Sequence, residues 1–139
     1  MKTKVGMLFC NLMFFSCKDA STDIDRNLSM QTGAVTYTQT EQIRVTLSNN
    51  SQQLLHLKPC CWGPDVRVQK NNEGTWETLD SACDLLACPW IDIPMKAREL
   101  LSQTLGRLEP GHYRLVLSYS SRSTVEFSHT VFSNEFKVE

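Results

Sequence analysis

Residues 108–120 read LEPGHYRLVLSYS, and this stretch decides the fold. It begins at a turn, because the Pro110-Gly111 pair is typical of turns. After the turn, apolar side chains occupy every second position, at Tyr113, Leu115, Leu117 and Tyr119. The side chains of a β-strand point alternately to its two faces, so this period of two predicts a strand with one face buried.

The same period recurs on both sides of this stretch. Apolar residues alternate with polar ones at Ile43, Val45 and Leu47, at Leu55 and Leu57, at Val66 and Val68, at Val125 and Phe127, and at Phe136 and Val138. Turn residues separate these runs, and the segment NNEG at residues 71–74 predicts a hairpin that leads into Trp76. Short strands at such spacing predict an all-β fold, an antiparallel β-sandwich of about seven strands.

One region, residues 95–108, has apolar spacing that also fits a helix. Its apolar residues are Met95, Ala97, Leu100, Leu101, Leu105 and Leu108. Periodicity alone leaves the helix open, but predicted strands lie on both sides of the region. We therefore favour strand or irregular structure for these residues.

Several of these segments resemble bacterial immunoglobulin-like domains, which are short sandwich modules of secreted proteins and lipoproteins. The stretch quoted above is similar to their Pro-Gly-Tyr-Arg-Leu strand, and the close of the chain, VFSNEFKVE, is similar to their last strand. EQIRVTLSNNS, at residues 41–51, resembles their opening strand, and VQKNNEGTWETL, at residues 68–79, resembles their strand–turn–Trp segment. The resemblance covers residues 34–139 and implies an immunoglobulin-like sandwich, but no particular activity.

Within this resemblance, Tyr113 has the position of a tyrosine corner, a tyrosine at the start of a late strand. We expect its ring to lie at the edge of the core and its hydroxyl to tie down the preceding connection. Two residues later, Leu115 stands where antibody-type domains have a cysteine. No disulfide between the sheets is therefore expected at that position.

Residues 1–17 have the pattern of a bacterial lipoprotein signal. Lys2 and Lys4 precede an apolar run, and Ser16 is the small residue directly before Cys17. The run is shorter than the roughly 20 apolar residues that a transmembrane helix needs. We expect export and lipidation of Cys17, which anchors the protein to a bacterial membrane, with plain secretion as the alternative.

The signal divides the chain into three parts. Residues 18–33 are polar and lack periodicity, so we expect a flexible tether there, followed by the immunoglobulin-like domain over residues 34–139. After Cys17 the chain keeps fifteen acidic and twelve basic side chains, a net charge of −3. No run of basic residues is present, which argues against nucleic acid as a partner.

Six cysteines are many for a chain of 139 residues. Beyond the signal, the four that remain are Cys60, Cys61, Cys83 and Cys88, and an exported compartment permits disulfides. A bond between the adjacent Cys60 and Cys61 requires a strained ring, so we expect each of them to pair with Cys83 or Cys88, in either of two ways. Adjacent cysteines fit the usual spacing of zinc ligands poorly, which makes a thiol metal site the weaker interpretation. We expect no metal and no cofactor.

The sequence offers no convincing catalytic motif. It lacks G-x-S-x-G, and its histidines, at positions 56, 112 and 129, lie in or beside predicted strands. Asp80, Asp84 and Asp92 lack the alternating spacing of a calcium loop. We therefore predict a protein without enzymatic activity.

Two tryptophans, Trp62 and Trp90, lie within two residues of a cysteine and are candidates for a binding surface, to which Trp76 is a possible addition. The alternative is that these rings cover the core. The prediction is a membrane-anchored binding or structural module with an unidentified protein or envelope partner. The rival prediction is a protease inhibitor that presents residues 80–95, including Pro89 and Pro94, as a disulfide-pinned loop.

Overall fold

The computed structural model describes residues 27–139, apart from residues 86, 90, 124 and 125. The regular structure of this part is all β-strand except for one turn of 3-10 helix, η1 (Ala82–Asp84). The strands are β1 (Leu28–Thr32), β2 (Thr36–Tyr37), β3 (Ile43–Asn49), β4 (Leu55–Leu57), β5 (Pro59–Cys60), β6 (Gly63–Pro64), β7 (Arg67–Asn72), β8 (Thr75–Thr78), β9 (Ile93–Met95), β10 (Leu100–Leu105), β11 (Gly111–Ser120), β12 (His129–Phe132) and β13 (Phe136–Val138).

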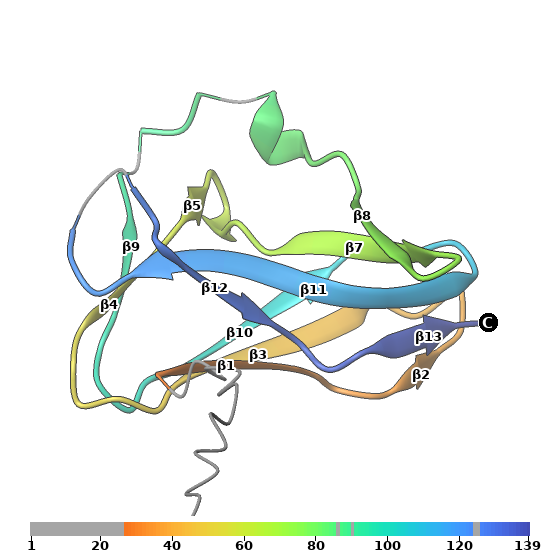
Figure 1. Ribbon diagram of the computed structural model, residues 1–139, viewed down its shortest axis with the longest axis horizontal. Helices are drawn as coiled ribbons and strands as arrows, with labels where there is room; N and C mark the ends of the chain where they lie inside the picture. Colours follow the sequence, from red (N-terminus) through yellow and green to blue (C-terminus); the bar gives the residue numbers. More distant parts are fainter. Residues whose placement is uncertain (1–26, 86, 90, 124–125) are drawn as a thin grey trace, which may run out of the picture.

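The strands form a β-sandwich with a small and a large sheet (Figure 1). The small sheet has the order β1-β3-β10, all antiparallel. In the large sheet β11 is central: β13 and β12 pair along one side of it, and β7 and β4 along the other. β2, β8 and β9 extend this sheet outward, and β5 pairs with β6 in a separate hairpin.

The predicted sandwich is confirmed, but it has more strands than the roughly seven that the sequence predicts. The described residues form thirteen strands, because short strands lie outside the predicted runs. β1, β2 and the two strands of the β5–β6 hairpin are examples. One predicted strand, at Val125 and Phe127, is not found: residues 126–128 are not strand, and Val125 lies outside the described residues.

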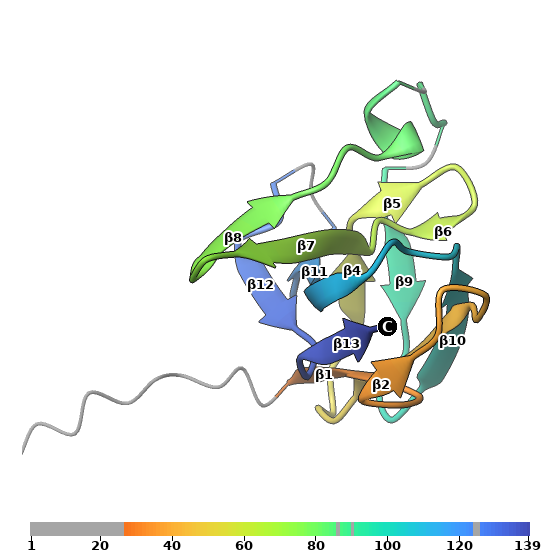
Figure 2. The ribbon, with the colours of Figure 1, turned by 90° about the vertical axis from the view of Figure 1, so that its right-hand side faces the viewer.

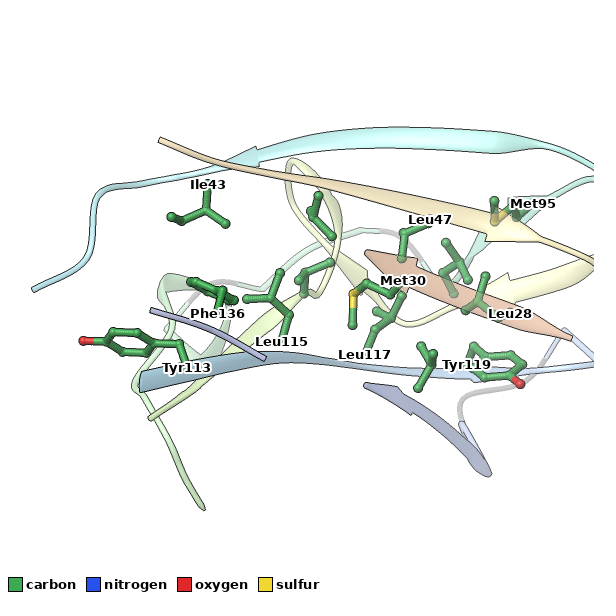
Figure 3. Close-up of a cluster of buried hydrophobic side chains, with 14 of the residues drawn as sticks. Leu28, Met30, Ile43, Leu47, Met95, Tyr113, Leu115, Leu117, Tyr119 and Phe136 are labelled. Atoms are coloured by element: carbon green, nitrogen blue, oxygen red, sulfur yellow. The ribbon is translucent and has the colours of Figure 1, made fainter. Parts of the chain in front are cut away.

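The core lies between the two sheets and is built from the alternating positions (Figure 3). Every second side chain of β11 is buried, from Tyr113 to Tyr119, and each is at most 1% exposed. β3 contributes its own alternate residues, Ile43, Val45 and Leu47, from the facing sheet. Burial of one face of each sheet is therefore what the period of two in the sequence encodes.

The first strand corrects the predicted tether. β1 occupies Leu28–Thr32, inside the range assigned to a flexible segment, and pairs with β3 over its whole length. Leu28 and Met30 are 1% and 3% exposed, so they belong to the core. Only two apolar residues mark this short strand, too few for the sequence pattern to stand out from the polar residues around it. Residues 1–26, which include Cys17, lie outside the described residues.

Residues 95–108, whose apolar spacing also fits a helix, form strands and irregular structure, as we expected. Met95 ends β9, and β10 then pairs with β3 from Leu100 to Leu105. Between them, Arg98 has a φ of 63°, in the left-handed region of a tight turn. The apolar residues that fit a helical spacing are therefore shared between two strands and a turn.

Candidate binding site at the disulfide-clamped end

Between β4 and β7 the chain leaves the large sheet over residues 58–65, a segment that we call the excursion. Its neck is closed because Asp65 N donates to Lys58 O at 2.8 Å and Lys58 Nζ lies 3.2 Å from Asp65 Oδ2. Inside it, β5 and β6 form a hairpin, and Gly63, directly after the turn, has a φ of 142°, a backbone conformation that favours glycine. The neck thus separates a small hairpin from the sheet without interrupting the core.

The excursion is bonded to the connection, residues 79–92, which runs from β8 to β9. Disulfides join Cys60 to Cys83 and Cys61 to Cys88, which is one of the two pairings left open by the sequence. The Cα atoms of the two pairs are 5.4 Å and 5.1 Å apart, within the usual range for a disulfide. Figure 1 shows the connection arching over β5. We call these two bonded segments the clamped end.

An ion-pair network reinforces the same junction. Asp65 is 2% exposed and accepts three hydrogen bonds from Arg67, whose guanidinium also donates to Asp84 at 2.8 Å. The hydrogen bond from Arg67 is the main reason that the pKa of Asp84 lies below its ordinary value. Asp65 likewise is the main reason that the pKa of Arg67 is raised. The network therefore joins the neck of the excursion, β7 and η1 through charges that are all paired.

A second polar cluster lies between β4 and the end of the connection. His56 Nδ1 is 3.1 Å from Asp92 Oδ2, and Ser123 Oγ donates to the same oxygen at 2.6 Å. Both groups therefore contact the carboxylate, and the histidine does not lie between serine and aspartate. A catalytic triad needs the histidine to contact the serine, so this arrangement does not activate Ser123 as a nucleophile.

An apolar pocket of about 420 Å³ opens between the excursion and β9. Its lining residues are Cys60, Cys61, Trp62, Gly63, Asp92, Ile93 and Pro94. Most of these groups are apolar, and Asp92 supplies the one charged group in the lining. The volume lies in the range of small-ligand pockets, and the apolar lining suits one or two apolar side chains of a partner better than a polar ligand.

The predicted binding residues have different outcomes. Trp62 lines the pocket with a side chain that is 73% exposed, so it does not cover the core. Leu85 and Ile91, on the connection, are 87% and 65% exposed. Trp90 lies outside the described residues. Trp76 is not part of this site: its ring packs against Arg114 and His112 of β11.

The arrangement around Trp76 was missed by the sequence analysis. The Arg114 guanidinium lies 4.3 Å from the centre of the Trp76 ring and 4.2 Å from that of Phe132, and its Nε donates to Gln69. Three neighbouring strands and β8 bring these groups to the outer face of the large sheet. The sequence gives little indication of this stacking, because a single arginine at an outward position of a strand is usually a solvated charge.

The remaining candidates are placed as follows. The four cysteine sulfurs are bonded in pairs, so they are not thiolate ligands, which removes the thiol metal site. His112 pairs with Glu135 at 2.9 Å, and His129 stacks on Tyr119. Asp80, Asp84 and Asp92 do not converge: Asp84 binds Arg67, and Asp92 lies beside His56. In the described parts of residues 27–139 no group of three metal-ligating side chains occurs.

The loop of the rival prediction, residues 80–95, is partly strand. Residues 93–95 are β9, where Met95 is fully buried, and Ala82–Asp84 is η1. The exposed part of the loop is therefore shorter than predicted and ends before Ile93. Across the described segments, no helix has the length and the apolar character needed to cross a bilayer.

Comparison with known families gives one match. The profile of a family described as a bacterial Ig-like domain matches residues 25–137, and this range includes β1. No curated protein matches the chain. The match supports the corrected start of the domain, because it begins ahead of residue 34.

Similar solved structures are distant. The alkylpurine DNA glycosylase AlkC of Pseudomonas fluorescens is 10% identical over 81% of this chain and 30% of its own, with a TM-score of 0.37. The CARDB domain of PF1109 from Pyrococcus furiosus is 13% identical over 81% of this chain and 94% of its own, with a TM-score of 0.35. A β-glucosidase from Listeria innocua is 14% identical over 81% of this chain and 16% of its own, with a TM-score of 0.32. The chain thus spans less than a third of the glycosylase, and these likenesses indicate nothing about its activity.

Proposed function

The chain belongs to the bacterial Ig-like domain family, and on that premise we propose that it is an exported, non-enzymatic binding module of the bacterial cell envelope. The proposal includes a lipid anchor on Cys17 and a contact surface at the clamped end. The observation that carries it is the apolar pocket beside Trp62, whose exposed ring is not part of the buried core cluster. Exposed aromatic rings beside a pocket are typical of interface anchors.

Two features make the clamped end suitable for binding. The disulfides fix the excursion and the connection to one another before a partner arrives, which lowers the entropy lost on binding. The pocket is apolar, so its partner is a protein segment that carries an apolar side chain. Asp92 Oδ2 already contacts His56 and Ser123, so we expect Asp92 Oδ1 to accept a hydrogen bond from such a segment.

The binding proposal is tested with peptides selected from a random phage-displayed library on the immobilised full chain. We expect Trp62→Ala to weaken the selected peptides at least tenfold while the thermal midpoint stays unchanged. Val35→Ala is the matched control, because Val35 is 69% exposed and is not among the pocket residues. Equal affinity for the Trp62→Ala variant, or failure to enrich any peptide, contradicts the proposal. A large drop in the thermal midpoint assigns Trp62 to packing instead.

The anchoring proposal is tested by the intact mass of the protein extracted from bacterial membranes. We expect a chain that begins at Cys17 and carries acyl chains, since two or three chains anchor a protein stably. Cys17→Ala is expected to release the protein from the membrane fraction. A mature mass without lipid contradicts the anchor and favours plain secretion.

The protease-inhibitor alternative has one observation in its favour. Leu85, 87% exposed, lies between Cys83 and Cys88, so a disulfide holds the chain on each side of it. Stoichiometric inhibition of a protease by the purified protein, lost in the Leu85→Ala variant, favours this alternative. Absence of inhibition across serine and cysteine proteases, or inhibition that survives Leu85→Ala, counts against it.

A further inference from the structure

β10 is an open edge of the small sheet. It pairs with β3 on one side, and none of the described strands pairs with its other side. Figure 2 shows β10 at the lateral border of the molecule. Constant-type immunoglobulin domains have four strands in the corresponding sheet, whereas the described residues supply three, so no described strand takes the position beyond β10.

The free edge of β10 presents regularly spaced backbone groups. Asn49 N donates to Glu99 O at 3.0 Å, which places the carbonyl group of Glu99 toward β3. In an antiparallel ladder this direction alternates residue by residue. The N–H and C=O groups of Leu100, Ser102 and Thr104 therefore point away from β3. The register with β3 is continuous from Leu100 to Leu105, so no bulge bends this edge.

The residues of β10 also lack the features that usually protect an edge. Its sequence, LLSQTL, has no charge and no proline, and Leu100 is 66% exposed. Charged residues, proline, shortness or a covering segment normally prevent an edge from pairing with another chain. β10 is six residues long and has neither a charged residue nor a proline.

The other edges of the described sheets are protected. Pro94 occupies the middle of β9, and β8 is four residues long and carries Glu77. β1 is covered, because Asn134 accepts from Thr32 N at 2.9 Å and donates to Thr32 Oγ1. β2 has only two residues, and β12, which among the described strands pairs with β11 alone, has four. Of these edges, β10 is therefore the one best suited to pair with a strand of another chain.

We propose that β10 pairs antiparallel with β10 of a second copy of this chain, so that two small sheets join into one six-stranded sheet. A two-fold axis at Ser102 sets Ser102 opposite Ser102 and Leu100 opposite Thr104, and these are the residues whose backbone groups are free. Directly opposed residues share a face, so the inward Leu101 and Gln103 face each other across the junction. No like charges meet, and the same patch is used on both copies, as a two-fold dimer requires.

The dimer is tested by sedimentation of the full chain, extracted from membranes in detergent, over a range of concentrations. The wild type is expected to sediment as a dimer that dissociates on dilution. Ser102→Lys brings two like charges together at the axis and is expected to weaken the dimer at least tenfold. Thr75→Lys makes a similar change at an exposed position of β8, and the dimer is expected to remain. A wild type that is monomeric throughout, or a Ser102→Lys dimer as tight as the wild type, overturns the proposal.

Amide hydrogen exchange on the wild type locates the contact without a substitution. The Ser102 and Thr104 amides are expected to become protected as concentration rises, whereas amides on β8 do not change. Protection that is independent of concentration, or that arises on another strand, overturns the proposal. Neither result bears on peptide binding by the pocket, so the two proposals are decided separately.

Discussion

The two ends of the sandwich are stabilised differently. At the end where β11 begins, which we call the aromatic end, aromatic rings are buried against one another. At the clamped end, disulfides and ion pairs hold segments whose apolar side chains stay exposed. Phe136 stacks on Tyr113 with ring centres 5.8 Å apart and meets Tyr37 edge-on at 5.6 Å. At the clamped end, in contrast, Trp62 and Leu85 are 73% and 87% exposed. The difference indicates that disulfides replace apolar packing there and leave those side chains available for contact.

Core truncation at the aromatic end has the largest expected effect. Phe136 is 1% exposed, and Phe136→Ala is expected to lower the free energy of unfolding by about 3–5 kcal/mol, since it leaves a cavity. Phe132→Ala is the matched control, because Phe132 is 46% exposed and contributes mainly its stack with Arg114. Its expected loss is about 1 kcal/mol. Denaturant unfolding measures both, and equal losses contradict the assignment of the core.

Removal of one disulfide comes next. Cys61→Ala with Cys88→Ala opens a loop with a sequence separation of 27 residues and is expected to cost about 3 kcal/mol, largely through the unfolded chain. The variant is expected to fold, because neither Cys61 nor Cys88 belongs to the buried core between the sheets. Denaturant unfolding gives the magnitude, and peptide binding by the folded variant reports on the pocket. Unchanged affinity of peptides that require Trp62 shows that this bond does not pre-order the site.

Much of the fold is predictable from the sequence because burial of one sheet face leaves a period of two. The alternation at Tyr113–Tyr119 and at Ile43–Leu47 identifies β11 and β3, and Leu115 and Val45 are fully buried as expected. Tyr113 is a tyrosine corner as expected: its hydroxyl donates to Glu109 O at 2.7 Å. These features are local, so each is encoded within a few neighbouring residues.

The remaining features depend on residues far apart in sequence. The choice between the two disulfide pairings follows from how the excursion meets the connection, which alternation does not encode. Asp65 and Arg67 are two residues apart in the sequence, but Asp84, the second carboxylate that Arg67 binds, comes from η1. Trp76, a possible addition to the Trp62 surface, lies elsewhere for the same reason, because the position of a tryptophan in the sequence says little about which rings meet in the fold.

Loss of the corner hydroxyl has a smaller expected effect. Tyr113→Phe keeps the ring and removes the hydrogen bond to Glu109 O, at an expected cost of about 1 kcal/mol. Tyr37→Phe is the matched control at the same end, because its hydroxyl accepts from Ala34 N at 2.8 Å. Similar small losses in both variants indicate that each hydroxyl fastens one connection. A cost of several kcal/mol for Tyr113→Phe is inconsistent with a single surface-edge hydrogen bond.

The smallest expected effect is a pH dependence at the clamped end. Arg67 lowers the pKa of Asp84 in the folded state, so the pair stabilises the fold above the ordinary Asp pKa of about 4. That contribution is lost as pH falls through the lower, folded-state pKa. Asp84→Asn is expected to lower stability slightly near pH 7 and to leave it almost unchanged near pH 2, so that this part of the acid dependence disappears. Thermal midpoints of both proteins between pH 2 and pH 7 measure the difference, and identical acid profiles contradict it.

The separation of the two ends is tested most directly by amide NMR spectra of the wild type and of the Cys61→Ala, Cys88→Ala variant, compared residue by residue. We predict that chemical shifts change within residues 58–66 and 79–95, and that Tyr113, Phe136 and the amides of β1 and β3 keep their positions. Shift changes that extend through the aromatic end, or a collapse of spectral dispersion, would contradict the account.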